Sequence, residues 1–199
     1  MLALGGCVQS VATPQSSAAA ARVLNRLGVQ LLNAPGSGCC GAVSHHLSAH
    51  EEGLDFMRRN IDAWWPFIEQ GIEAILVTAS GCGAVVKDYG HLLSHDPAYA
   101  DKAQRVSALT RDVAEVLRDA DLSGVALGRQ AQRVAFHSPC TLQHAQQLDG
   151  VVETILSRAG FTLTAVPDAH LCCGSAGTYS ILQPELSRRL LTNKLTALQ

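Results

Sequence analysis

The spacing of the cysteines constrains this chain more than any other feature of its sequence. Cys39 follows Cys7 by 32 positions, and Cys172 follows Cys140 by the same 32. Each second member opens the tripeptide Cys-Cys-Gly. A structural unit that occurs twice explains this pattern, because chance rarely repeats a long spacing together with a tripeptide.

The two halves also match outside the cysteines. Laid on each other at an offset of 133 residues, they align Glu52 with Glu185 and Asn60 with Asn193. Each half shows the same expected order of strand, helix and strand before its Cys-Cys-Gly loop. The expected elements are a strand at 2–4, a helix over 16–27 and a strand at 29–32 in the first half, and a strand at 134–136, a helix over 142–159 and a strand at 161–166 in the second.

The first half continues beyond its Cys-Cys-Gly loop. Apolar residues recur at three-to-four spacing between positions 47 and 68, which predicts an amphipathic helix with both tryptophans in the core. The apolar run over 73–78 is typical of a buried strand and delivers Cys82 near its carboxyl end. A helical run over 99–117 is expected to follow.

Alternating strands and helices predict the α/β class, with two duplicated units that each hold a short parallel sheet flanked by helices. Parallel sheets place binding sites beyond the carboxyl ends of their strands, so the cysteines should converge there. We expect a first unit at 1–122, a polar linker at 123–132 and a second unit at 133–199. The second unit is expected to be truncated, because the counterpart of Cys82 would fall at position 215, beyond Gln199.

The seven cysteines favour metal binding. The number is odd and two pairs are adjacent in sequence, which fits a disulfide framework poorly. The first half offers four thiols, enough to complete a tetrahedral zinc site or to hold a four-iron cluster, and the residues alone leave that choice open. Flanking glycines would let backbone amides approach the sulfur atoms. The candidate ligands are Cys7, Cys39, Cys40, Cys82, Cys140, Cys172 and Cys173.

Two other interpretations of the cysteines stay open. Free cysteines are often simply buried as small hydrophobic side chains. A catalytic thiol at Cys140 with His137 as its base is conceivable, although a repeated set of thiols is more than one nucleophile requires. We assign no catalytic residue. The remaining histidines are expected mainly at the surface or at helix ends.

Charge and hydropathy exclude several classes of function. A formal net charge of −2 and an isoelectric point near 6.4 give no basic field for nucleic acid. The sequence lacks an apolar run of the roughly 18 residues that span a bilayer, and its first residues do not resemble a secretion signal. We therefore expect a cytoplasmic chain that reaches a membrane only through its partners.

Several longer motifs identify a family resemblance. They are Asn60-Ile61-Asp62-Ala63-Trp64-Trp65-Pro66, Thr78-Ala79-Ser80-Gly81-Cys82-Gly83, Pro139-Cys140-Thr141-Leu142-Gln143-His144-Ala145-Gln146, and the segment 170–179 around Cys172-Cys173-Gly174. Together with the repeated Cys-Cys-Gly pattern, they resemble the cysteine-rich CCG domains of heterodisulfide reductases and of dehydrogenase iron-sulfur subunits. The resemblance is closest to the glycolate oxidase iron-sulfur subunits.

This resemblance implies an electron-transfer subunit that carries 4Fe-4S clusters when intact. Such a subunit takes electrons from flavoprotein subunits that oxidise glycolate and passes them toward a membrane acceptor, at the inner face of the cell membrane. The chain departs from the broader pattern at Val85, where that pattern has a further cysteine. The alternatives are a structural zinc or docking domain without a redox role, and thiol-disulfide chemistry like that of heterodisulfide reductase.

Overall fold

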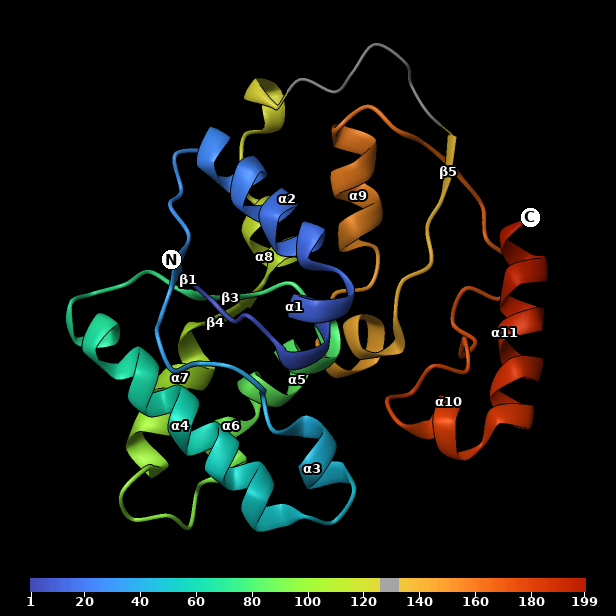
Figure 1. Cartoon of the computed structure of the whole chain (residues 1–199). Helices are drawn as coiled ribbons and strands as arrows, with labels where there is room; N and C mark the ends of the chain where they lie inside the picture. The colour runs from blue at the N-terminus through green and yellow to red at the C-terminus, as the bar shows by residue number, and fades with distance from the viewer. Residues whose placement is uncertain (126–132) are drawn as a thin grey trace. The chain divides into compact units, whose positions relative to one another are not determined.

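The computed structural model describes residues 1–125 and 133–199 (Figure 1). It separates into two compact units, unit 1 (Met1–Gly124) and unit 2 (Val125–Gln199). Both contain short parallel sheets flanked by helices, so the predicted α/β class is confirmed. Most of the linker expected at 123–132 lies outside the described residues, and the unit boundaries expected from sequence remain predictions.

Unit 1 is built on a parallel sheet of four strands. β1 (Leu2–Ala3) lies between β2 (Leu32–Asn33) and β3 (Ile75–Val77), and β4 (Thr110–Asp112) pairs with the other side of β3. In this order the chain moves from β1 to one side and then returns to the other. Such a reversal leaves a crevice at the carboxyl ends of the central strands, where doubly wound proteins bind their ligands.

Helices cover both faces of this sheet. In Figure 1 the sheet lies between α2 and α8 on one face and α4 and α7 on the other. A glycine pair before α1 ends the first strand, and Gly6 combines a φ of 63° with a ψ of 145°, a conformation that suits only glycine. The helices of unit 1 are α1 (Cys7–Ala12), α2 (Pro14–Arg26), α3 (Ala42–His46), α4 (His50–Glu69), α5 (Ser80–Lys87), α6 (Tyr89–Leu92), α7 (Ala100–Leu109), α8 (Val113–Arg118) and a 3-10 turn at Leu122–Gly124.

Helix α4 carries the core of unit 1, as its apolar periodicity predicts. Met57, Ile61 and Trp64 on its inner face are fully buried and belong to the same core cluster as Leu2 and Ile75 of the sheet. Burial of each such side chain contributes roughly 1.5–3 kcal/mol relative to exposure. The second tryptophan is only partly buried at the edge of this core.

The prediction of one continuous helical run over 99–117 is wrong. The chain leaves α7 at Leu109 and pairs with β3 as β4 before α8 begins. A capping box explains the break: the Asp112 side chain accepts a hydrogen bond from the Ala114 amide, and the Glu115 carboxylate accepts one from the Asp112 amide. This motif starts a new helix and leaves the preceding residues free to extend the sheet.

Unit 2 has a parallel sheet of two strands among its described residues. Arg133 of β5 (Arg133–Ala135) is in register with Thr162 of β6 (Thr162–Thr164). The helix expected over 142–159 is interrupted, because the chain turns through positive φ at Gln147 (55°) and Gly150 (73°). The helices of unit 2 are a π-helical turn at Thr141–Ala145, α9 (Val151–Arg158), α10 (Tyr179–Leu182) and α11 (Pro184–Leu198).

A glycine follows each of two helices, α2 and α9. Gly28 follows α2 with a φ of 78°, and Gly160 follows α9 with a φ of 91°. Both therefore end a helix in the left-handed region, where glycine carries no steric cost. Among the helices of the described residues, none is long and apolar enough to cross a membrane.

Candidate metal centre

Three adjacent strands of unit 1 deliver its four cysteines to one edge of the sheet. Cys7 opens α1 directly after β1, Cys39 and Cys40 lie in the loop after β2, and Cys82 lies in the first turn of α5 after β3. Because the strands are parallel, their carboxyl ends meet at the same edge. Cys7, the Cys39-Cys40 pair and Cys82 come together for this reason, although more than thirty residues separate each from the next.

The thiols contact one another in two pairs. Cys39 hydrogen-bonds to Cys7, and burial together with this contact raises the pKa of Cys39 to about 11, although the Gly41 amide lowers it. The hydrogen bond that Cys40 donates to Cys82, together with burial, raises the pKa of Cys40. The same hydrogen bond lowers the pKa of Cys82, which is therefore the more acidic thiol of that pair. Cys7 and Cys39 also act electrostatically on Cys82, so the two pairs are close neighbours.

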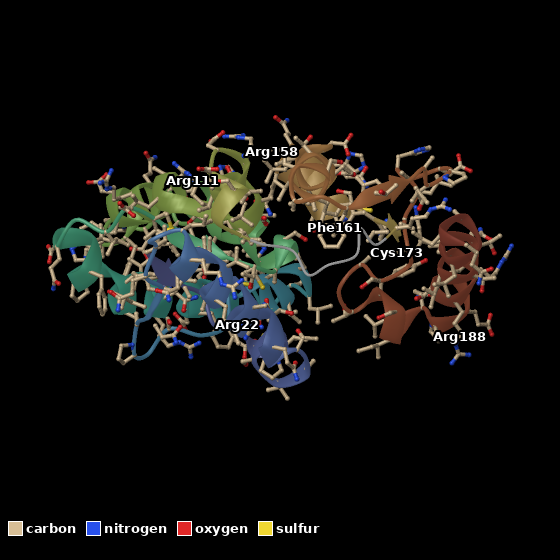
Figure 2. The ribbon with its side chains drawn as sticks, turned by 90° about the horizontal axis from the view of Figure 1, so that it is seen from above. Arg22, Arg111, Arg158, Phe161, Cys173 and Arg188 are labelled. Carbon is tan, nitrogen blue, oxygen red and sulfur yellow. The ribbon has the colours of Figure 1, made fainter. Side chains whose placement is uncertain are left out.

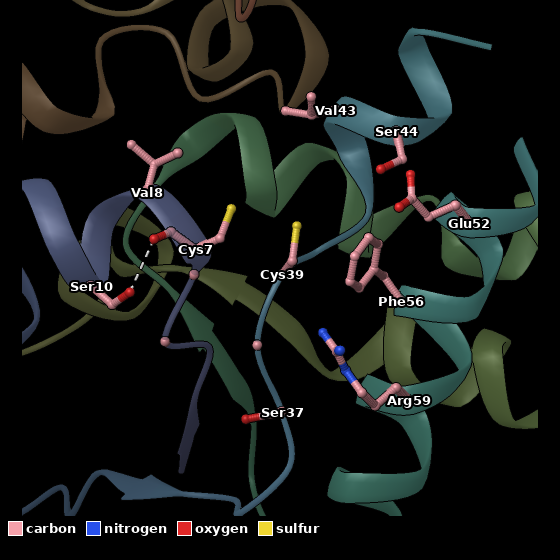
Figure 3. A pocket seen from close by; sticks show the side chains of 13 residues that line it. Cys7, Val8, Ser10, Ser37, Cys39, Val43, Ser44, Glu52, Phe56 and Arg59 are labelled. Atoms are coloured by element: carbon pink, nitrogen blue, oxygen red, sulfur yellow. Dashed lines mark hydrogen bonds between the residues drawn. The ribbon is translucent and has the colours of Figure 1, made fainter. Parts of the chain in front are cut away.

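An open pocket of about 730 Å³ lies over the first pair. In Figure 3 the sulfur atoms of Cys7 and Cys39 point the same way, side by side, into this pocket. Phe56 and Arg59 of α4 form part of its wall. Cys40, in contrast, is only 3% exposed and belongs to the hydrophobic core cluster. The site thus has one open side and one buried side.

Two buried side chains fix the loop that carries Cys39 and Cys40. The Asn60 amide oxygen accepts a hydrogen bond from the Gly38 amide at 2.8 Å, and its nitrogen donates to the Cys39 carbonyl at 2.8 Å. The Tyr89 hydroxyl donates to the Cys40 carbonyl at 2.8 Å and accepts from Asn60 at 3.1 Å. Groups that orient ligands in this way govern both the geometry and the affinity of a metal site.

The sequence patterns single out neither Asn60 nor Tyr89 as functional. Asn60 nevertheless carries a signal, because it lies on the same helical stripe as Met57, Ile61 and Trp64 and is fully buried. A polar residue on an apolar stripe requires hydrogen-bond partners. Tyr89 has no comparable signal, since its position near the loop depends on how α6 packs.

The glycine of each Cys-Cys-Gly motif has the same local geometry in both units. Gly41 has a φ of 84° and Gly174 a φ of 81°. Their amides donate to the sulfur atoms of Cys39 (3.5 Å) and Cys172 (3.3 Å). A side-chain carbon on Gly41 would lie 2.5 Å from the Gly53 carbonyl oxygen, so only glycine fits.

In the helices that follow the two Cys-Cys-Gly loops, the halves no longer align at the offset of 133 found from the sequence. A side-chain carbon on Gly174 would lie 2.3 Å from the Ser187 carbonyl oxygen, so Ser187 occupies the place that Gly53 takes in unit 1. This corresponds to an offset of 134. Asn193 is accordingly exposed, whereas Lys194 is buried and donates to the carbonyls of Asp168 and Ala169.

Unit 2 brings its three cysteines together at the end of its own small sheet. Cys140 precedes the π-helical turn after β5, and Cys172 and Cys173 lie in the loop between β6 and α10, where Figure 2 labels Cys173. Burial raises the pKa of Cys140, and the neighbouring Cys172 adds to this effect. Both ring nitrogens of His137 are buried without a hydrogen-bond partner among the described residues, and burial lowers the pKa of this histidine.

The donor set fits a metal group that thiolates hold. Within residues 1–125 and 133–199, no three His, Cys, Asp or Glu side chains converge on the point that a single ion would occupy. The thiols of unit 1 instead contact in pairs, and a backbone amide already donates to one of the sulfur atoms. Four thiolates gathered in this way can hold either a single thiolate-bound ion or an iron-sulfur cluster. The clustered histidines His45, His46 and His50 pack ring to ring.

Comparison with known proteins agrees with this geometry. A family model described as "Cysteine-rich domain" (CCG) matches residues 2–87 and 134–199. The "Glycolate oxidase iron-sulfur subunit" of Escherichia coli K12 is 57% identical over all of this chain and 49% of the relative. The "Probable glycolate oxidase iron-sulfur subunit" of Bacillus subtilis is 28% identical over 98% of this chain and 44% of the relative.

A third relative extends the comparison to another group of proteins. "Lactate utilization protein A" of Bacillus licheniformis is 28% identical over 91% of this chain and 74% of its own length. The chain spans about half the length of the two glycolate oxidase relatives. The family model covers both cysteine-bearing halves, and the chain belongs to the cysteine-rich CCG domain family.

Proposed function

We propose that unit 1 binds an iron-sulfur cluster through Cys7, Cys39, Cys40 and Cys82, and that the chain serves as an electron-transfer module. One observation carries this proposal: three parallel strands deliver four thiols to one sheet edge. Four thiolates are the usual ligand set of a 4Fe-4S cluster. Relatives named as iron-sulfur subunits support the same interpretation.

When bound, the cluster supplies a centre that accepts and releases one electron at a time. The chain's own residues hold and shield it. The Gly41 amide donates to the Cys39 sulfur, which withdraws charge from that ligand. Asn60 and Tyr89 fix the loop between them, so the sulfur positions change little when the charge of the cluster changes.

The wider assembly follows from what the relatives are called. Because two of them are named as subunits of a glycolate oxidase, we propose that this chain works with flavoprotein subunits that oxidise a 2-hydroxy acid. It would then pass electrons toward an acceptor at the membrane, from the cytoplasmic side. The three thiols of unit 2 are proposed as ligands of a second centre.

Anaerobic reconstitution tests the cluster directly. The chain is purified without oxygen, supplied with iron and sulfide, and measured for bound iron, acid-labile sulfide and visible absorption. An iron-sulfur cluster gives a broad visible band that bleaches when dithionite is added. A colourless protein that retains one zinc ion per chain would instead establish the structural zinc domain. Turnover of a small disulfide by the reconstituted chain would favour the thiol-disulfide alternative.

A further inference from the structure

Arg59 is a cation that lines the same pocket as Cys7 and Cys39. Its guanidinium carbon lies 4.7 Å from the centroid of the Phe56 ring, which holds it without neutralising it. The ion pairs of the described part of the chain involve Arg58, Lys87 and Arg118, and none includes Arg59. Its positive charge therefore has no carboxylate partner there.

The packing of Arg59 keeps this charge next to the cysteine loop. Its Nη2 atom lies 3.3 Å from the position that a Cβ atom on Gly38 would occupy, so the guanidinium packs against Gly38, the residue before Cys39. In Figure 3 the guanidinium reaches toward that loop, whereas Glu52 points toward Ser44 on the far side of Phe56. Helix α4 thus presents its positive group on the side of the thiols.

We propose that Arg59 raises the reduction potential of the cluster held in unit 1. This inference rests on the proposed function. Reduction adds one electron from an external donor to the cluster, so the cluster becomes more negative and is stabilised by a nearby positive charge. Because Arg59 is exposed, water and salt screen this attraction and keep it modest.

The test is a redox titration of the reconstituted chain and its variants, followed by visible absorption. Removal of the charge in Arg59→Gln should lower the equilibrium constant for reduction about threefold, which is about 28 mV at 59 mV per tenfold for one electron. Arg59→Glu reverses the charge and should lower it about tenfold, or about 59 mV. Arg59→Lys should titrate like the wild type.

Two further variants check the sign and the location of the effect. Glu52→Gln removes a negative charge from the same pocket and should shift the potential upward. Arg22→Gln is the matched control, because Arg22 lies on α2, which leads away from α1, where Cys7 lies, and back toward the start of β2 (Figure 1). It should leave the potential unchanged. Every shift should shrink in 1 M salt, where charges interact over only about 3 Å.

The outcomes separate this inference from the proposed function. If the wild-type chain binds no iron after reconstitution, the proposed function fails, and this inference fails with it. If iron and sulfide are bound normally but Arg59→Gln and Arg22→Gln titrate alike, the inference alone is overturned. It is also overturned if Arg59→Lys shifts as far as Arg59→Gln, because packing and not charge would then be responsible.

Discussion

Replacement of Asn60 by alanine tests whether the loop that carries Cys39 and Cys40 depends on its buried amide. The substitution removes the hydrogen bonds to Gly38, Cys39 and Tyr89. At about 1 kcal/mol net for each bond, with a further cost for buried groups left without partners, unit 1 should lose about 3 to 4 kcal/mol of unfolding free energy. Bound iron should fall as well, because the ligand loop loses its support.

Urea unfolding followed by tryptophan fluorescence measures this loss for unit 1 alone. Both tryptophans of the chain lie in α4, so their emission reports the unit that holds Asn60. Tyr89→Phe removes the hydroxyl and should cost about 2 kcal/mol. The double variant should lose less unfolding free energy than the sum of the two single losses, because each single substitution already removes the hydrogen bond between Asn60 and Tyr89.

Asn25→Ala is the control, since Asn25 is an exposed residue of α2 in the same unit. It should change the unfolding free energy by less than about 0.5 kcal/mol. A loss below about 1 kcal/mol for Asn60→Ala, with an unchanged dependence on urea, would refute the role assigned to the amide.

Two other substitutions test particular contacts. Gly41→Ala should destabilise unit 1 by at least about 2 kcal/mol, because its new carbon would meet the Gly53 carbonyl, whereas Gly71→Ala, with a similar φ of 85° but open space around it, should cost only about 1 kcal/mol. Equal losses in urea unfolding would exclude the backbone clash. Asp96→Asn should destabilise the chain at pH 7, because the hydrogen bond from Arg58 holds the pKa of Asp96 below its usual value. Because the folded-state pKa is lowered, the ionised carboxylate stabilises the folded chain at pH values above the unfolded-state pKa. The difference in stability between wild type and variant should therefore vanish as the pH falls to about 2. A difference that is independent of pH would contradict this.

The convergence of the cysteines could be predicted because it follows from topology. Alternating strands and helices imply parallel strands, and parallel strands end at one edge, so Cys7, Cys39 and Cys82 had to meet. The α/β class could be predicted from the same alternation of strands and helices. Neither inference depends on how individual side chains pack.

The features that sequence analysis missed depend on local packing. Strand β4 is only three residues long and lies between two helices, so it is too short to interrupt a helical pattern, although the capping box at Asp112 marks the break. The shift from an offset of 133 to 134 follows from how closely Gly53 and Ser187 approach the glycines of the two loops. Arg59 is one of many exposed charges until the pocket around it is known.

The iron content of two serine variants tests the central claim most directly. Serine nearly preserves the shape of cysteine but is a poor ligand for iron, so Cys82→Ser opens the site of unit 1 while Cys140→Ser leaves it complete. After anaerobic reconstitution, Cys82→Ser should lose most of the bound iron and visible absorption, and Cys140→Ser should retain most of both. Equal losses, or a greater loss from Cys140→Ser, would contradict the assignment of the cluster to Cys7, Cys39, Cys40 and Cys82.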